Sequence, residues 1–347
     1  GVRLMAKMIK YSLWSKLKFP VNSGEKRILD AYVNADIVLS CGGGFLGGYG
    51  IRASLLSFFR LYEIYFAKLL SKPVIIYAQS IDQFGNALAL SVAKFVLNRV
   101  DLITLRERIS MDYLKSLAIK PKVILTADAA FLLKSISTEE SLKLLAEENV
   151  HPCQQPLVGI TARHWKFPRY GDGKVRFENY LEVIANTIEY LTSNMNATVV
   201  LFAQVTYPPG DDDRIVSNEI ASRVENKANI RLLTKDYTPG ELKGIIGQMD
   251  LFIGTRMHSN IFALSMVVPA IAISYKKKTD GIMNMLGMTE YVLDMANLRL
   301  NDIIHLIQLA QHNRQSIRSS LRSRIREAQR QALYNALLVT DMLHVNA

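Results

Sequence analysis

Cysteine is scarce in this chain, which has only Cys41 and Cys153 among its 347 residues. Two cysteines are too few for a disulfide framework, and their spacing matches no zinc motif, so we predict neither a disulfide-built domain nor a metal site. Long apolar runs are also missing, because no stretch reaches the length of about 18 residues that a helix needs to span a bilayer. The opening segment, GVRLMAKMIKYSLWSKLKF, lacks a signal-peptide cleavage pattern. These absences predict a cytoplasmic protein.

Acidic residues are outnumbered, because the chain has 42 Lys and Arg but 31 Asp and Glu, for a net charge of +11 and a pI of about 9.5. Such an excess calls for an anionic partner: nucleic acid, a membrane surface or a phosphorylated substrate. Nucleic acid is disfavoured, because the strand ends lack the interleaved aromatic and basic residues of stacking platforms. The opening segment has the pattern of an amphipathic helix lying on anionic lipid, although an ordinary packed helix gives the same pattern. Its residues are Lys7, Lys10, Lys16 and Lys18 with Leu4, Met8, Trp14 and Leu17.

Two common nucleotide-binding motifs are absent as well. The chain has no G-x-G-x-x-G with an acidic residue about 20 positions further on, and no Gly-Lys-Ser/Thr, so neither NAD nor direct ATP chemistry is predicted. It has instead a glycine-rich stretch, SCGGGFLGG, after an apolar run. Gly43 and Gly44 in this stretch mark either a tight turn or a place where the backbone approaches a ligand.

Apolar β-branched runs that end in small or polar residues alternate with helical patterns along the chain. This alternation is typical of βαβ units and a parallel sheet, and the length favours two domains of about 150 residues each. In the first half we predict strands at residues 36–44, 73–80, 101–107 and 122–131, with helices at 54–70 and 87–98. The second half has predicted strands at 156–165, 197–204, 229–234, 250–254 and 270–275, with helices at 180–194, 239–249 and 301–343.

A polar stretch over residues 135–156 separates the two halves. We therefore predict an α/β protein of two Rossmann-like, doubly wound domains that face each other across a cleft. The predicted domains are residues 1–150 and 151–295, followed by a helical extension over 296–347. The basic run of this extension is typical of a solvent-exposed helix face, and we expect the extension to bridge back to the first domain.

The segment DLFIGTRMHSNIFALSMVVP, residues 250–269, is the strongest candidate site. An apolar strand stops at Gly254 and delivers Arg256 and His258 to the start of an apolar helix, where free backbone N–H groups favour an anion. His258 is the side-chain type that can give or take a proton near neutral pH. Arg163 ends the strand VGITAR in the same way, so both guanidinium groups can grip one ligand that carries phosphate and carboxylate. The alternative is that Arg256 and His258 are only a helix cap or solvent-exposed side chains at the start of a helix.

Other polar residues end the strands of the first half. Gln79 could offer a neutral hydrogen bond to a sugar. Arg106 could bind a ligand, although a structural pair with the adjacent Glu107 is the alternative. Asp128 could cap a turn or orient an acceptor hydroxyl.

The order of motifs along the chain resembles the polysaccharide pyruvyl transferase family. The motifs are SCGGGFLGG, YAQSIDQFG, LRERISMDYL, ADAAFLL, VGITAR, DLFIGTRMHSNIFAL and VPAIAISY, spread over about residues 36–287. No single motif is diagnostic, so the resemblance depends on their order and spacing. Family members commonly open with a strand and a Gly/Asn-rich turn, and this chain starts at GVRLMAKMIKY, past that segment.

This resemblance implies a twin-domain fold of the glycosyltransferase B type, and transfer of a pyruvyl group from phosphoenolpyruvate to a sugar as a cyclic ketal. It implies that Arg163 and Arg256 bind the donor, that His258 is catalytic, and that no cofactor is needed. The acceptor could be a nucleotide sugar, a lipid diphosphate oligosaccharide or a finished polymer. The candidate substrate-binding residues are Arg163, Arg256, Ser259, Gly43, Gly44, Gln79 and Arg106.

Two other functions stay open at this point. A glycosyltransferase of the same fold would place the diphosphate of a nucleotide sugar at the Arg256 helix, because a fold does not determine its chemistry. A non-catalytic basic protein that binds nucleic acid or a membrane is the other class.

Overall fold

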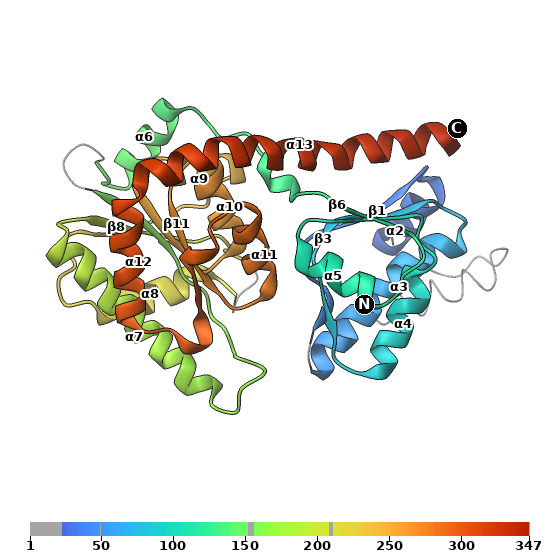
Figure 1. The fold of residues 1–347 in the computed structure, drawn as a ribbon, viewed down its shortest axis with the longest axis horizontal. Coiled ribbons are helices and arrows are strands. Elements are labelled where there is room, and N and C mark those ends of the chain that lie inside the picture. Colours follow the sequence, from blue (N-terminus) through green and yellow to red (C-terminus); the bar gives the residue numbers. More distant parts are fainter. Residues whose placement is uncertain (1–22, 49, 152–155, 208–210, 347) are drawn as a thin grey trace. The chain divides into compact units, whose positions relative to one another are not determined.

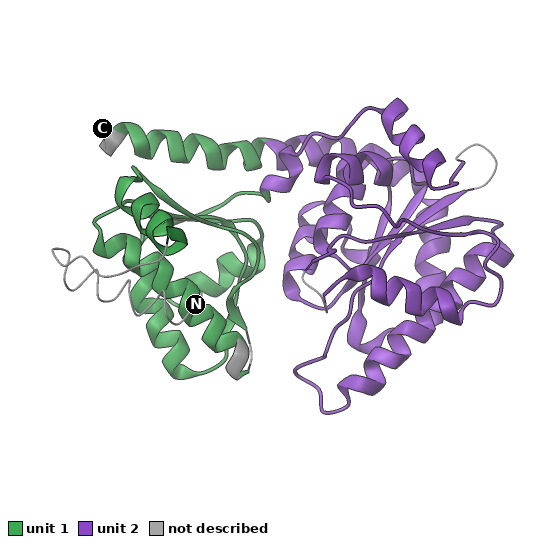
Figure 2. Cartoon of the chain, turned by 180° about the vertical axis from the view of Figure 1, so that it is seen from behind, with its two compact units in different colours: residues 1–128, 330–347 green, residues 129–329 purple. Residues whose placement is uncertain are grey.

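The computed structural model describes residues 23–48, 50–151, 156–207 and 211–346 of the chain. Cys153 and the amphipathic pattern of residues 4–18 lie outside these ranges. The chain forms two compact units, drawn in different colours in Figure 2. Unit 1 contains residues 1–128 and 330–347, and unit 2 contains residues 129–329. Each unit has a parallel sheet with helices packed on it (Figure 1), which confirms the predicted α/β class.

Unit 1 contains a 4-stranded parallel sheet in the order β1-β3-β5-β6, and β2 and β4 form a separate parallel pair. Its centre is apolar: Ile75, Ile76 and Ile103 are fully buried. The predicted strands are confirmed but end earlier, because their polar last residues form loops at the carboxyl edge. The elements are β1 Val38–Cys41, β2 Leu46–Gly48, β3 Val74–Gln79, β4 Ile81–Phe84, β5 Leu102–Leu105 and β6 Lys122–Leu125, with α2 Ser23–Asn34, α3 Ile51–Leu69, α4 Ala87–Leu97 and α5 Arg108–Ser116.

Unit 2 contains a 6-stranded parallel sheet in the order β12-β11-β10-β7-β8-β9. The strands are β7 Leu157–Thr161, β8 Thr198–Phe202, β9 Ile230–Leu232, β10 Leu251–Gly254, β11 Ala270–Ser274 and β12 Val292–Asp294. The α-helices are α6 Thr138–Glu147, α7 Gly173–Asn194, α8 Asp213–Arg223, α9 Pro239–Ile246, α10 Met257–Ser265, α11 Lys277–Met285 and α12 Leu300–His312, and the short 3-10 helices are η1 Ala129–Leu132, η2 Thr289–Tyr291 and η3 Met295–Asn297.

Several elements of unit 2 were not predicted from the sequence, among them α6, α8, α11 and β12. β12 is only a short edge strand, and α8 has a largely polar sequence, DRIVSNEIASR, with Val216 and Ile220 as its buried apolar residues. Two helices of this unit begin where the sequence carries a clear signal. Ser137 and Glu140 form a capping box at the start of α6, and Thr238 and Glu241 form another at the start of α9.

The chain ends in two helices, where one helix over 301–343 was predicted. α12 packs on α7, and α13 spans Arg314–Asn346 after a break at Asn313. α13 belongs to unit 2 up to residue 329 and to unit 1 from residue 330. Asn335 of α13 is buried, accepts a hydrogen bond from Thr126 Oγ1 at 2.9 Å and donates one to the Ala127 carbonyl at 3.1 Å.

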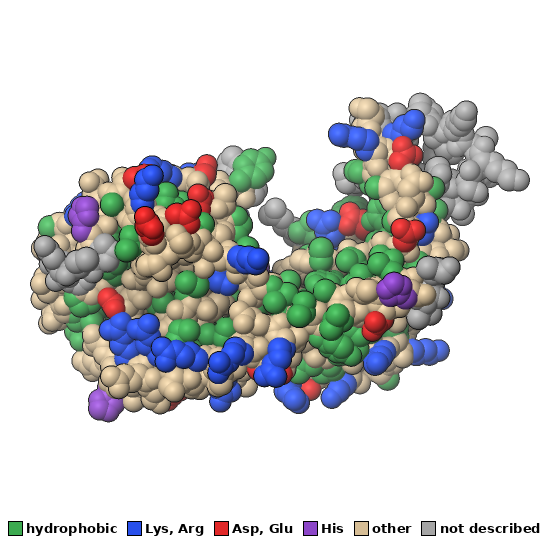
Figure 3. All heavy atoms as spheres, turned by 90° about the horizontal axis from the view of Figure 1, so that it is seen from above, with side chains coloured by type: hydrophobic (Ala, Val, Ile, Leu, Met, Phe, Trp, Pro, Cys, Tyr) green, Lys and Arg blue, Asp and Glu red, His purple; other side chains and the backbone are tan. Residues whose placement is uncertain are grey.

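Basic side chains are prominent on the surface that Figure 3 shows, where blue Lys and Arg groups lie on each of the two units. Several arginines of α13 contribute exposed charge to the chain's positive balance, and they are Arg322, Arg324, Arg326 and Arg330. This exposure agrees with the reading of the basic run as a solvated face. None of the helices within the described ranges is long and apolar enough to cross a membrane.

The division between the units falls after Asp128, earlier than the predicted boundary at residue 150. The polar stretch that suggested the boundary contains α6, which packs on α9 of unit 2. Hydrogen bonds fix the preceding segment to α9 as well, from Ile136 N to the Gly240 carbonyl at 3.3 Å and from Lys243 Nζ to the Leu133 carbonyl at 2.7 Å. The predicted extension over 296–347 is likewise not one body, because α12 lies in unit 2.

Lys243 predicts a stability change at alkaline pH. Burial lowers the pKa of this ammonium to about 8, whereas an unfolded lysine has a pKa of about 10.4. Between these values the unfolded chain binds more protons than the native chain, so raising the pH favours the native state. We expect the free energy of unfolding of wild type, relative to Lys243→Met, to rise between about pH 8 and pH 10. Urea titrations of both proteins at several pH values test this, and parallel curves would contradict it.

Candidate functional site

Four neighbouring strands of unit 2 each supply a polar side chain from the loop at the carboxyl end. In the sheet order β11-β10-β7-β8, these side chains are Tyr275, Arg256, Arg163 and the carboxylates of residues 211–213. The central strands run in register, with Gly254 opposite both Thr161 and Ala272. Because the carboxyl ends of parallel strands meet at one edge, these loops converge. The structure therefore brings Arg163 and Arg256 together.

Arg256 is held by a buried carboxylate. Asp213, only 1% exposed, accepts hydrogen bonds from Arg256 Nη2 at 2.6 Å and from Arg256 Nε at 3.0 Å. The backbone N–H groups of Gln204 and Val205 donate to the same carboxylate at 3.1 and 3.0 Å. Burial raises the pKa of Asp213 above its ordinary range, and the hydrogen bonds from Arg256 oppose that shift. Two-point pairing of this kind fixes the plane of the guanidinium group.

Asp211 connects the two arginines. Its Oδ1 atom accepts from Arg256 Nη2 at 2.9 Å and from Arg163 Nη2 at 3.3 Å. Unlike Asp213, the Asp211 side chain is 42% exposed. One oxygen of a partly exposed carboxylate thus lies between two guanidinium groups, where an oxygen of an anionic ligand would also be favoured.

This position predicts that Asp211 competes with an anionic ligand for both arginines. In Asp211→Asn the competing charge is removed while the side-chain volume is kept, so we expect phosphate to bind about tenfold more tightly. Titration calorimetry with inorganic phosphate measures the change, and Asp236→Asn, which alters another exposed carboxylate, is the control. Weaker binding by Asp211→Asn would show that Asp211 instead orients the arginines.

Aromatic rings cover the other side of Arg163. Its Nη1 donates to the Tyr275 hydroxyl at 2.6 Å, and its guanidinium carbon lies 4.5 Å from the Tyr275 ring centroid and 5.1 Å from that of Trp165. Such contacts hold a cation over π-faces without neutralising it. Since β7 already ends at Thr161, Arg163 lies in a loop, and the predicted strand up to residue 165 is too long.

The first turn of α10 carries His258 and Ser259. Arg256 is the N-cap residue of α10, and its side chain forms no cap hydrogen bond to the first turn. His258 is half-buried in this turn. Ser259 is fully buried, and its hydroxyl is 2.8 Å from Thr161 Oγ1 and donates to the Arg256 carbonyl at 2.7 Å. Ser259 therefore ties α10 to β7, and the predicted ligand contact would require an accessible hydroxyl.

Unit 1 has its own polar cluster at the carboxyl ends of β3, β5 and β6. Arg106, 2% exposed, donates from Nε to Ser80 Oγ at 2.8 Å and from Nη1 to Asp128 Oδ2 at 2.6 Å. Its Nη2 is buried and has no acceptor among the residues that the structure describes. The expected Arg106–Glu107 pair is wrong, because Glu107 turns away to cap α5 at Ser110 N.

The glycine stretch explains part of this cluster. A side chain at Gly43 would place its Cβ 2.7 Å from Arg106 Nη2, and Gly44 has a left-handed φ of 72°. The tight-turn interpretation therefore holds for Gly44, and Gly43 makes room for the guanidinium group. Gln79, predicted to contact a sugar, is fully buried and donates from Nε2 to the Ser40 carbonyl at 2.6 Å. It links β3 to β1.

We expect Gly43→Ala to destabilise the protein by about 1–3 kcal/mol, because Arg106 is pinned by Ser80 and Asp128 and cannot move aside. Thermal unfolding of Gly43→Ala, compared with Gly171→Ala, tests this. Gly171 is the matched control, because an added Cβ there meets nothing within 4 Å. Equal melting temperatures for the two variants would contradict the prediction.

Several residues of these clusters were missed by the sequence analysis. Asp211, Tyr275 and Trp165 lie in loops after strands and Asp213 begins α8, and only their position after an apolar run could have signalled them. Among the described residues, no group of three or more His, Cys, Asp or Glu side chains could hold a metal ion. The expected absence of a metal and a cofactor stays a prediction.

The fold of the chain is that of glycosyltransferase B proteins. HepE from Anabaena, crystallised with UDP-glucose, aligns with a TM-score of 0.60 and 12% identity over 92% of this chain and 81% of its own. Sucrose-phosphate synthase from Thermosynechococcus elongatus aligns with a TM-score of 0.60 and 10% identity over 99% and 80%. A UDP-N-acetylglucosamine 2-epimerase from Listeria monocytogenes gives 0.59 and 12% identity over 95% and 82%. These similarities establish the architecture.

The chain belongs to the polysaccharide pyruvyl transferase family, whose sequence model matches residues 5–277. It is 27% identical over 254 residues to the amylovoran biosynthesis protein AmsJ of Erwinia amylovora. That match covers 72% of this chain and 61% of AmsJ, so the chain spans less than two thirds of this relative. The family consists of transferases of polysaccharide biosynthesis, which confirms the resemblance inferred from the order of the motifs.

Proposed function

We propose that the protein transfers the pyruvyl group of phosphoenolpyruvate onto two hydroxyl groups of a sugar, forming a cyclic ketal and releasing phosphate. The observation that carries this proposal is the pair Arg163 and Arg256, joined through Asp211 beside the start of α10. Phosphoenolpyruvate bears a carboxylate and a phosphate on a small frame, so two guanidinium groups and a helix N-terminus match both charges. Family membership supports the same reaction class.

The bonds and protons of the proposed reaction balance, and a single proton-carrying side chain is enough. The methylene carbon of the donor gains a proton, and one sugar hydroxyl forms a C–O bond to the neighbouring carbon. The bond to the phosphate oxygen then breaks as the second hydroxyl forms the other C–O bond. Overall, one hydroxyl proton replaces the proton given to carbon and the other leaves with the phosphate.

His258 is the proposed proton carrier, because it lies two residues after Arg256 in the first turn of α10. A bound phosphate dianion beside the imidazole would favour its protonated form, so donor binding would prepare the acid for the first step. Arg163 and Arg256 would hold the donor, and the aromatic contacts of Arg163 would keep its guanidinium group in place.

The acceptor is proposed to be a sugar of a polysaccharide or of its lipid-linked precursor, bound by unit 1. AmsJ is named for the biosynthesis of amylovoran and the family is named for polysaccharides, which supports this acceptor class. The Arg106 cluster is the polar feature at the carboxyl edge of the unit 1 sheet, and its unpaired Nη2 is the group that an acceptor or a water molecule could complete. We also propose that the protein is cytoplasmic, where phosphoenolpyruvate is available as the donor.

Melting temperatures with added phosphoenolpyruvate, phosphate, pyruvate or UDP test the donor. A ligand that binds the native state stabilises it by about 2.7 kcal/mol at 100 times its Kd. We expect phosphoenolpyruvate to raise the melting temperature of wild type but not of Arg163→Ala. Arg163 is the better variant for this test, since its loss strands no buried carboxylate. A shift with UDP alone would contradict the proposal and indicate glycosyl transfer.

A further inference from the structure

Helices α3 and α4 of unit 1 expose an unusual amount of apolar side chain. On α3, Leu55, Phe58 and Leu69 are 54%, 41% and 44% exposed, at the spacing of one helix face with Tyr62 and Tyr65 between them. On α4, Leu88 is 76% and Phe95 is 44% exposed. The helices pack together, and the Tyr65 and Phe95 rings meet edge to face at 5.3 Å. The two apolar stripes are therefore neighbours.

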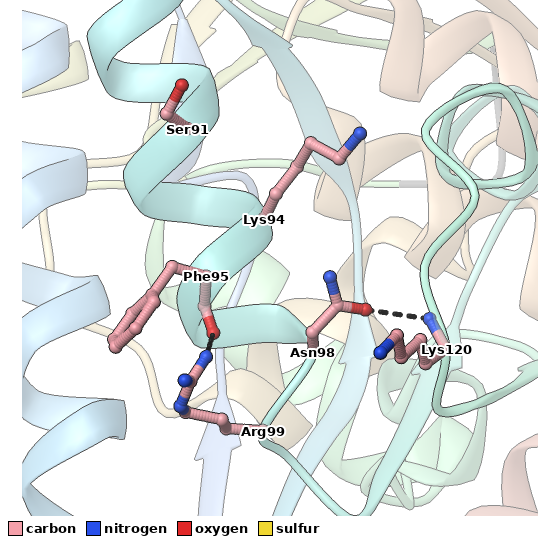
Figure 4. A pocket seen from close by; sticks show the side chains of 6 residues that line it. All are labelled: Ser91, Lys94, Phe95, Asn98, Arg99 and Lys120. Atoms are coloured by element: carbon pink, nitrogen blue, oxygen red, sulfur yellow. Dashed lines mark hydrogen bonds between the residues drawn. The ribbon is translucent and has the colours of Figure 1, made fainter.

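An open hollow with positive charge adjoins this apolar surface. It has a volume of about 660 Å³ and is widely open to solvent. Its lining residues are Ser91, Lys94, Phe95, Asn98, Arg99 and Lys120. Figure 4 shows Lys94 extending from α4 and Lys120 approaching Asn98 from the other side. Phe95 belongs to both the hollow and the apolar stripe, so charge and apolar surface are continuous.

The cations of the hollow are not neutralised within the described ranges. Lys94, Arg99 and Lys120 form no ion pair there, whereas the nearby Lys68 is paired with Asp101 at 2.7 Å. Arg99 instead stacks over Phe95, with its guanidinium carbon 3.5 Å from the ring centroid. The sequence of α4 contains no acidic residue. A helix C-terminus attracts cations by itself, but Lys120 comes from another segment and still faces the same hollow.

This surface combines exposed aromatic and aliphatic side chains with unpaired cations. A bilayer with anionic headgroups is a partner complementary to both features. The apolar residues would enter the headgroup boundary, and the hollow would hold a lipid phosphate. The hollow precedes the amino ends of β5 and β6, whereas the Arg106 cluster follows the carboxyl ends of β3, β5 and β6. The two features therefore lie at opposite edges of the sheet and do not compete.

We propose that the exposed face of α3 and α4, together with the hollow formed by Lys94, Arg99 and Lys120, docks this protein on an anionic membrane surface. The proposal stands on unit 1 alone and holds whatever reaction the protein catalyses.

Sedimentation of the full chain with lipid vesicles tests the proposal. We expect binding to vesicles of phosphatidylglycerol and phosphatidylcholine in equal parts, and little binding to phosphatidylcholine alone. Lys120→Gln should lower the partition coefficient about fivefold, and Leu88→Ser should lower it by a similar factor. Both side chains are exposed, so neither variant disturbs a core.

Matched controls come from α7 of unit 2, where Lys174 and Val175 are also exposed. Lys174→Gln and Val175→Ser should bind vesicles as wild type does, and all variants should keep the wild-type melting temperature. Equal binding to both vesicle types, or unchanged binding by Lys120→Gln and Leu88→Ser, would overturn the proposal. A wild-type dimer that Leu88→Ser converts to a monomer, with no vesicle binding by either, would assign the face to self-association instead.

Discussion

His258→Ala is expected to bind phosphoenolpyruvate as wild type does and to lose turnover by about 10²- to 10⁴-fold. The reason is that the donor charges are proposed to be met by Arg163 and Arg256, while the imidazole alone moves the proton. Donor affinity from titration calorimetry and phosphate release with a sugar acceptor separate the two effects. His258→Gln is a useful companion, because it keeps a polar side chain but cannot carry a proton near neutral pH.

Two results would contradict this role for His258. Full turnover in His258→Ala would remove it from the chemistry. A loss of donor binding equal to that of Arg163→Ala would make it a binding residue. His305, on α12 of unit 2, provides a control, since His305→Ala should leave both measurements unchanged.

Arg256→Ala and Arg163→Ala are expected to weaken donor binding alike but to differ in stability. Removal of Arg256 leaves Asp213 buried and without its cation, which typically costs about 3–5 kcal/mol. Removal of Arg163 loses its contacts with Tyr275, Trp165 and the exposed Asp211 but leaves no buried charge, so we expect a smaller loss, of about 1 kcal/mol. Urea unfolding of both variants measures the difference.

A double variant isolates the cause of that instability. Arg256→Met with Asp213→Asn removes the stranded charge and keeps an amide oxygen for the Gln204 and Val205 N–H groups. We expect it to recover most of the lost stability without recovering donor binding. Equal stability of the single variants Arg256→Ala and Arg163→Ala would refute the assignment of Asp213 as the buried anchor.

Local patterns predicted the parts of the site that follow directly from strand periodicity. Arg163 and Arg256 could be placed together because each comes two residues after an apolar strand, and the ends of neighbouring parallel strands converge. The predicted family and fold follow from motifs that lie on the same strand ends.

The ion-pair partners of the site arginines could not be predicted, because they come from loops of irregular shape. Asp211 and Asp213 precede Arg256 by more than a whole βα unit, and no local pattern connects them to it. Arg106 likewise pairs with Asp128 after the adjacent strand β6, while its sequence neighbour Glu107 caps the start of α5. Two predicted ligand residues, Ser259 and Gln79, are fully buried and join neighbouring elements, a structural use of polar side chains that local patterns do not reveal.

Unit 1 is assembled from two separate stretches of chain, and unit 2 is topologically an insertion within it. A fragment that stopped at residue 128 would lack Asn335, which binds Thr126 and Ala127 from the far end of the sequence. A ribosome would release the strands of unit 1 long before the helix segment that completes them emerges. Expression of unit 1 by itself would therefore need a linker joining residues 128 and 330, whereas unit 2 is continuous and can be excised directly.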